Sequence, residues 1–129
     1  MANGMSDYLE NAILDATLRG LAFTSPTTVY LALYTSDPTD ANTGVEVSGG
    51  AYARQAITFN APSNGSASSA ADVLFPIATA AWGTITHIAI FDAATGGNML
   101  YSAPLTTSKT IASGDQLKVA AGDVTVSLD

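Results

Sequence analysis

The stretch Thr84-Ile85-Thr86-His87-Ile88-Ala89-Ile90-Phe91 is the most strand-like part of this 129-residue chain. It is rich in β-branched and aromatic residues, which pack well on a pleated, half-buried surface. The segment Ala93-Ala94-Thr95-Gly96-Gly97-Asn98 follows it with the composition of a hairpin loop and leads into Met99-Leu100-Tyr101. The sequence therefore predicts a β-hairpin in this region.

Further strand-like runs lie on both sides of this hairpin. Thr28 to Thr35 is apolar in both of its alternating sets, which predicts a strand covered on both faces, with the N-terminal helix as one candidate cover. Shorter runs lie at residues 53–59, 71–75, 107–111, 116–119 and 124–128. Turn residues separate them at intervals of roughly 8–12 residues, which is typical of sandwiches. We expect a mainly β fold, an antiparallel β-sandwich or jelly roll of about eight strands with one N-terminal α-helix.

The N-terminal segment is predicted to be helical. Ser6 or Asp7 can cap the first turn, apolar residues recur at helical spacing from Leu9 to Ala16, and Gly20 can end the helix in a left-handed conformation. We expect a single domain over residues 1–129, with a helical segment at 1–22 and the β-sandwich at 23–129.

The composition excludes several classes of protein. Four Lys and Arg against eleven Asp and Glu give a net charge of -7, which argues against a nucleic-acid surface. The chain has no cysteine, so disulfide scaffolds, thiolate metal sites and cysteine nucleophiles are excluded. Neither a signal peptide nor an apolar run long enough for a membrane span is apparent, and we expect no membrane partner.

Residues suited to catalysis or metal binding are few. His87 is the single histidine and lies in the middle of a predicted strand, where a structural role is the simpler interpretation. The segment from Ser36 to Ala51 is long enough to be a protruding loop with a role of its own. It holds Asp37, Asp40, Asn42 and Glu46, but these lack the spacing of a known calcium loop. We predict no enzyme activity, no catalytic residues, no cofactor and no metal.

The composition of the surface gives more indications of function than the few candidate catalytic residues do. Only 12% of the residues are charged and almost half are Ala, Thr, Ser or Gly, so much of the surface is suited to close packing against copies or partners. The N-terminal helix, with Met1 beside it, either contacts a partner or caps its own sandwich. Tyr52 and Trp82 can form a sugar-binding platform or anchor loops in the core, and Arg54 is expected to pair with a nearby acid. The candidate partner-interface residues are Met5, Tyr8, Leu9, Tyr52, Arg54 and Trp82.

Two blocks of the sequence resemble a family of short tailed-bacteriophage virion proteins, which are described as tail-fibre-like or head decoration proteins. The first is Val29-Tyr30-Leu31-Ala32-Leu33-Tyr34-Thr35-Ser36-Asp37-Pro38-Thr39-Asp40 with Glu46-Val47-Ser48-Gly49-Gly50-Ala51-Tyr52-Ala53-Arg54-Gln55 after it. The second is Trp82-Gly83-Thr84-Ile85-Thr86-His87-Ile88-Ala89-Ile90-Phe91-Asp92-Ala93-Ala94-Thr95-Gly96-Gly97-Asn98-Met99-Leu100-Tyr101. The similarity spans nearly the whole chain.

The resemblance implies a structural role in the virion, with the protein made in the cytoplasm of the host bacterium. We expect a capsid decoration (cement) protein, a homotrimer that binds and stabilises the major capsid protein shell. The chain is short and has neither heptads nor a repeat, whereas a fibre usually needs a shaft or a separate tip. The alternative is a tail fibre or collar appendage involved in host adhesion. A third hypothesis is a small carbohydrate-binding protein built around Trp82 and Tyr52.

Overall fold

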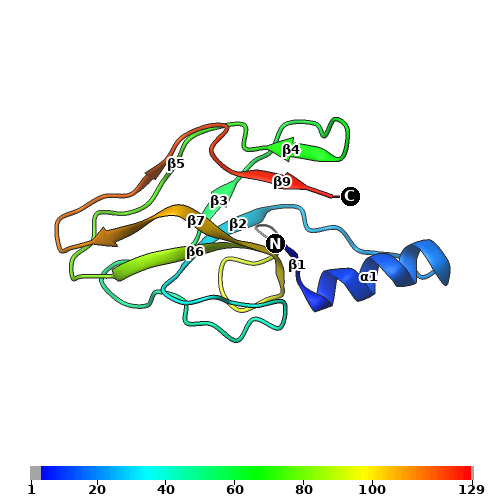
Figure 1. Ribbon diagram of the computed structural model, residues 1–129, viewed down its shortest axis with the longest axis horizontal. Helices are drawn as coiled ribbons and strands as arrows, with labels where there is room; N and C mark the ends of the chain where they lie inside the picture. Colours follow the sequence, from blue (N-terminus) through cyan, green and yellow to red (C-terminus); the bar gives the residue numbers. More distant parts are fainter. Residues whose placement is uncertain (1–3, 129) are drawn as a thin grey trace.

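The computed structural model describes residues 4–128 and has a five-stranded antiparallel sheet at its centre (Figure 1). The strand order in this sheet is β1-β7-β6-β2-β3, and two small two-stranded ladders, β4-β9 and β5-β8, lie over one side of it. In chain order the elements are β1 (Gly4–Met5), α1 (Asp7–Leu18), β2 (Val29–Tyr34), β3 (Gln55–Ile57), β4 (Ser66–Ser68), β5 (Val73–Leu74), β6 (Gly83–Phe91), β7 (Met99–Ile111), β8 (Lys118–Val119) and β9 (Thr125–Ser127). The predicted fold class, a mainly β sandwich with an N-terminal helix, is confirmed.

The predicted hairpin forms the middle of the sheet. β6 pairs antiparallel with β7, and Ile90 lies opposite Tyr101. The Asp92 carboxylate accepts hydrogen bonds from the backbone and side-chain nitrogens of Asn98 at 2.7 and 3.1 Å, which closes the loop between the two strands. An Asp that bonds to backbone nearby is a common way to stabilise a turn. The local composition of this segment was therefore sufficient to predict it.

β2 is covered on both faces, as predicted, but the helix covers neither of them. Leu31 and Leu33 face the main core, which is closed by the segments that carry the two small ladders. Ala32 and Tyr34 face a second cluster, where the Tyr34 ring stacks on Phe91. The loop after β2 lies over this second cluster, because Tyr34 Oη donates a hydrogen bond to Asn42 of that loop at 2.7 Å. The helix instead leaves the edge of the sheet next to β1 and β7 (Figure 1).

The far half of β7 differs from the expectation. Residues 107–111 were predicted as a separate strand, but they continue β7 beyond an irregularity in its pairing with β6. The register shifts between the pairs His87↔Pro104 and Ile85↔Lys109, so several residues of β7 lie opposite Thr86 alone. Extra residues on one strand form a bulge, which bends and twists the strand locally. β1 pairs with the outer edge of β7 only at Gly4 and Met5 in the described part of the chain.

α1 begins as predicted and is anchored by its cap. The Ser6 hydroxyl accepts a hydrogen bond from the Leu9 amide at 3.1 Å and donates one to the carbonyl of Met99 on β7. Gly20, with a φ of 69°, follows the helix in the left-handed conformation that was expected. Ser6 is therefore both a helix cap and a connection to the sheet.

We expect Ser6→Ala to lower the free energy of unfolding by about 1–2 kcal/mol, because it removes a helix cap and a buried hydrogen bond to the Met99 carbonyl. Urea unfolding measures the loss. Thr17→Ala is the matched control, since the exposed Thr17 hydroxyl bonds to the carbonyls of Ile13 and Leu14 in its own helix. Equal effects of the two substitutions would contradict the anchoring role of Ser6.

Candidate functional site

Only the first turn of α1 packs against the body of the molecule. Leu9 is buried in the main core, and the Ser6 and Asp7 amides donate hydrogen bonds to the carbonyls of Leu100 and Asp40, both at 2.9 Å. From Ile13 onward the helix projects beyond the sheet (Figure 1). The helix is therefore fixed at its base and free of the sandwich along its second half.

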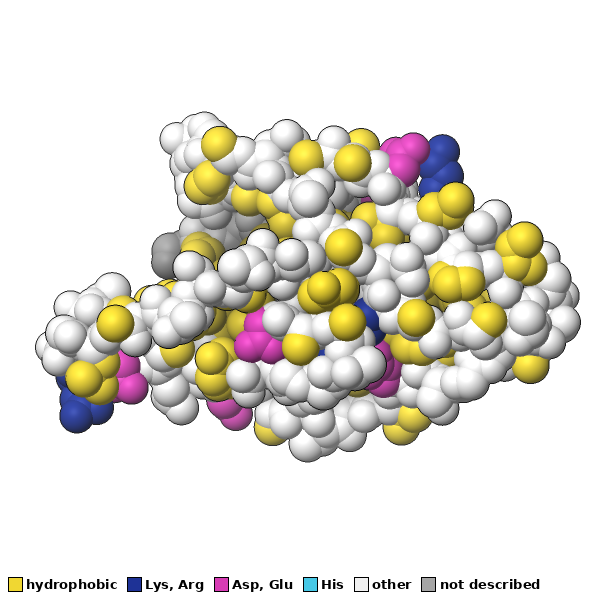
Figure 2. Space-filling view, turned by 180° about the vertical axis from the view of Figure 1, so that it is seen from behind, with side chains coloured by type: hydrophobic (Ala, Val, Ile, Leu, Met, Phe, Trp, Pro, Cys, Tyr) yellow, Lys and Arg dark blue, Asp and Glu magenta, His cyan; other side chains and the backbone are white. Residues whose placement is uncertain are grey.

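The projecting half carries large apolar side chains. Leu14 is 53% exposed, Leu18 is 77% exposed and Leu21 is 48% exposed. Leu14 and Leu18 are four residues apart and so share a helix face. The Leu21 amide donates a hydrogen bond to the Asp15 carbonyl, which folds the chain back over the end of the helix. We call Leu14, Leu18 and Leu21 the leucine stripe. Figure 2 shows hydrophobic side chains exposed along this projecting arm.

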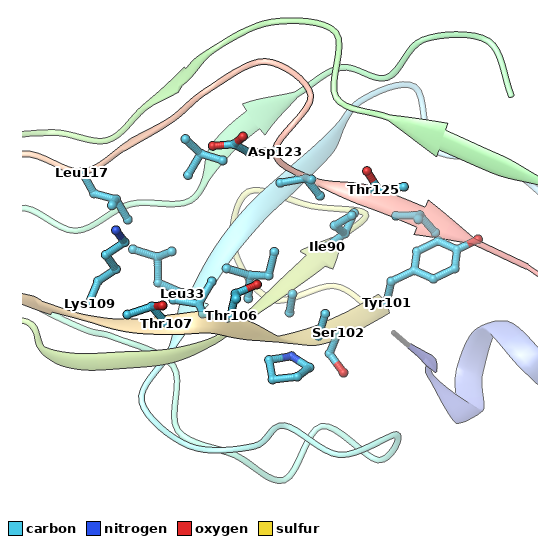
Figure 3. Close-up of a pocket in the computed structure, with 18 of the residues that line it drawn as sticks. Leu33, Ile90, Tyr101, Ser102, Thr106, Thr107, Lys109, Leu117, Asp123 and Thr125 are labelled. Atoms are coloured by element: carbon cyan, nitrogen blue, oxygen red, sulfur yellow. The ribbon is translucent and has the colours of Figure 1, made fainter. Parts of the chain in front are cut away.

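A groove lies over the sheet, between β7 and the segment that carries β8 and β9 (Figure 3). Its volume is about 640 Å³, in the range of pockets that bind small molecules. Its lining is mostly apolar and includes side chains from the main core. We call it the β7 groove; Leu33, Ile90, Leu105, Leu117, Val124 and Val126 supply much of its apolar lining.

Charged side chains also line the β7 groove. Lys109 and Lys118, two of the four cations of the chain, line it together with Asp123. Lys118 pairs with Asp72 at 3.5 Å, whereas Lys109 makes no ion pair with any residue of the described range 4–128. The groove is thus mostly apolar, and its lining holds one ammonium group, that of Lys109, which forms no ion pair among the described residues.

The long loop after β2 is fastened to the sheet by an ion pair. Arg54 binds the Glu46 carboxylate through two nitrogens, each at 2.9 Å, and its remaining terminal nitrogen donates to the carbonyls of Ala93 and Gly96. The guanidinium also lies 3.7 Å from the ring centroid of Phe91, a cation–π contact. We call Arg54 and Glu46, with the Ala93 and Gly96 carbonyls, the clasp. The Arg54 side chain is only 8% exposed, so the clasp is largely buried. The predicted pairing of Arg54 with a nearby acid is confirmed.

The surroundings of the clasp shift the pKa values of Glu46 and of the neighbouring Tyr34. Burial alone would raise the pKa of Glu46, but hydrogen bonds from Arg54 and Tyr52, together with the Arg54 charge, outweigh it and lower that pKa. Burial, with the nearby Glu46 charge as the second cause, raises the pKa of Tyr34 to about 12. Glu46 is therefore held as a carboxylate and Tyr34 as a neutral phenol at neutral pH.

Tyr52 and Trp82 hold the same loop from the inside. The Tyr52 hydroxyl donates to Glu46 at 2.6 Å and accepts from the Leu33 amide at 3.1 Å. The Trp82 indole packs edge-on against Tyr52, and its nitrogen donates to the Gly50 carbonyl at 2.8 Å. Gly50 has a φ of 59°, and a side chain there would come within 2.9 Å of the Trp82 ring nitrogen. Both aromatics therefore anchor loops, and the Trp82 ring is too buried to serve as a sugar platform.

The structure separates the six predicted interface residues into two groups. Tyr52, Arg54 and Trp82 lie together inside the sandwich, while Met5, Tyr8 and Leu9 lie at the base of α1. Tyr8 is the one with a largely exposed side chain, and Met1 lies outside the described residues. The leucine stripe was missed, although the spacing of its leucines in the sequence would have revealed a second apolar helix face.

The acidic residues of the loop after β2 do not converge on one point. Glu46 belongs to the clasp, Asn42 accepts the Tyr34 hydrogen bond, and Asp37 lies 4.0 Å from His87. Asp40 instead approaches Asp7 and Glu10 of α1, and the three exposed carboxylates can place oxygens within 4.8 Å of one another. Exposed carboxylates this close repel one another at neutral pH. The base of α1 is consequently a point of concentrated negative charge.

No helix within residues 4–128 is long and apolar enough to cross a membrane.

Comparison with known proteins gives one informative match. A family model described as "Podophage GP4 fiber I protein gp80" matches residues 4–127, which is nearly the whole chain. No curated protein matches the sequence. The match includes α1, the clasp and the β7 groove within a single family region.

Proposed function

Because the chain belongs to the podophage GP4 fiber I protein gp80 family, and is thus a structural component of a phage particle, we propose that it serves as a subunit of a fibre. In this proposal the protein acts by packing against other subunits and catalyses no reaction. The exposed leucine stripe is the observation that carries the proposal, since apolar side chains on a projecting helix gain free energy when a neighbour buries them.

The interior supports the same role. The clasp and the Trp82 cluster fix the long loop to the sheet, so the sandwich is a rigid body from which α1 projects. A rigid body loses little conformational entropy when it assembles, which favours close packing of many copies. Small and uncharged residues over much of the surface contribute in the same way.

The alternative is the decoration role, in which the protein binds the major capsid protein as a trimer. Its support is the compact form of the described residues 4–128, which fold as one sandwich with a single projecting helix. A compact unit of this kind suits a knob placed over the junctions of a shell. The β7 groove and α1 would then meet capsid subunits instead of fibre subunits.

Immunogold labelling of intact particles, combined with copy number from quantitative mass spectrometry, separates these roles. For a fibre subunit we expect label on discrete appendages and a low copy number. Label over the whole head with hundreds of copies would replace the fibre proposal by the decoration role. Absence of the protein from purified particles would contradict both.

A further inference from the structure

We propose that the leucine stripe of one copy docks into the β7 groove of a second copy of this chain. The inference rests on the proposed function only in assuming that copies pack against one another. It specifies which surfaces meet, and it makes the contact head-to-tail, with a different surface contributed by each partner.

The two surfaces match in their apolar character. The helix presents Leu14, Leu18 and Leu21, all about half exposed or more. The groove offers about 640 Å³ lined by aliphatic side chains of the main core, including Leu105 and Leu117 (Figure 3). Burying both together removes apolar surface from water on each side of the contact.

Charge complementarity selects this occupant over a neutral one. Asp7 and Glu10 lie seven and four residues before Leu14, so the helical period places them on the same face as the stripe. They face the crowded carboxylate of Asp40 in their own copy. Lys109 makes no ion pair with a described residue, although Asp123 also lines the groove, so the acidic helix of a neighbouring copy would give Lys109 a partner and draw negative charge away from Asp40.

The geometry of a single copy leaves both surfaces available. α1 is attached beside Tyr101, where β1 pairs with β7, and Tyr101 lies at one end of the groove. Lys109 lies at the other end, and α1 points away from the body (Figures 1 and 3). The helix of a second copy in the same orientation would enter at the Lys109 end with its acidic base next to that lysine. Such a contact repeats: copies in the same orientation extend along a fibre, and only a fixed rotation from one copy to the next would close them into a ring.

The first test measures association of the purified chain by light scattering after size-exclusion chromatography. We expect wild-type oligomers, and at least a tenfold weaker association for the double variant Leu14→Gln and Leu18→Gln. Glutamine is a good helix former, so the substitutions remove apolar surface without breaking α1. Val45→Gln is the matched control, since Val45 is 61% exposed and lies in the long loop away from the groove. A monomeric wild type, or equal association of both variants, would overturn the proposal.

The second test exchanges charges across the contact. Lys109→Glu alone and Glu10→Lys alone should each weaken association, because each places like charges together. The two changes combined in one chain should restore it, since every contact would then have the reversed pair. Circular dichroism checks that each variant keeps its fold. Additive weakening in the combined variant would overturn the assignment of these two residues to one contact.

The third test uses the absence of cysteine from the chain. A Leu18→Cys copy is mixed with a Thr107→Cys copy and treated with a short bismaleimide, and we expect a covalent heterodimer. Val45→Cys in place of Thr107→Cys should give only background. A chain carrying both Leu18→Cys and Thr107→Cys that links internally when diluted would show α1 folding onto its own groove and would overturn the proposal. These tests use no virus particle, so a wrong location in the virion would leave their outcome unchanged.

Discussion

Trp82→Ala is expected to lower the free energy of unfolding by about 3–5 kcal/mol, the usual cost of truncating a large buried aromatic side chain. Trp82 is only 5% exposed, and its ring meets both Tyr52 and Phe75 edge-on with centroids 5.5 and 6.3 Å away. The substitution also removes the hydrogen bond to the Gly50 carbonyl. Because small domains have a total stability of about 5–15 kcal/mol, this loss is a large part of the whole.

Urea unfolding followed by far-ultraviolet circular dichroism measures this effect. Trp82→Phe is the graded variant, since it keeps an aromatic ring but loses the hydrogen bond, and we expect a smaller loss. Ile77→Ala is the control for removing an apolar side chain, because Ile77 is exposed. A loss below about 1 kcal/mol for Trp82→Ala would contradict a loop-anchoring role for this residue.

The second large effect concerns Glu46 and depends on pH. At pH 7 we expect Glu46→Gln to cost about 1.5–3 kcal/mol, because it removes a charged partner of Arg54 and of Tyr52. The folded protein lowers the pKa of Glu46 below its ordinary value of 4.5. The stability contributed by the carboxylate is therefore fully present above pH 4.5 and is lost as the pH falls through the lower folded-state value.

Stability curves of the wild type and the variant should consequently converge below pH 4.5 and separate above it. Asp72→Asn is the control, because Asp72 is an exposed carboxylate whose pKa is lowered by the Ala121 amide and then by Lys118. We expect its curve to follow that of the wild type closely, since interactions of exposed charges are weak. A difference between wild type and Glu46→Gln that does not change with pH would contradict a charged clasp.

The parts of the structure that depend on short segments could be predicted from the sequence. The β6–β7 hairpin has its turn residues between two apolar runs, and the α1 cap lies next to the helix that it begins. In both, the interacting residues are a few positions apart, so composition and spacing contain the necessary information.

The parts that depend on distant pairing could not be predicted. The strand order brings β1 next to β7, about a hundred residues away, and no local pattern encodes that choice. The N-terminal helix was named as one candidate cover for β2, whereas the loop after β2 and the segments with the small ladders cover its two faces. Residues 107–111 were predicted as a separate strand, whereas they continue β7 past a bulge that no local pattern reveals.

That bulged half of β7 would have a consequence if many copies of the protein assemble side by side, as proposed above. An open strand edge is a template on which identical chains can stack without limit, and amyloid grows in this way. The Pro104 nitrogen has no proton to donate, Lys109 adds charge, and the bulge turns the edge out of line. Backbone-to-backbone growth is therefore discouraged at this edge, so in the proposed assembly neighbouring copies would meet through side chains and remain separable units.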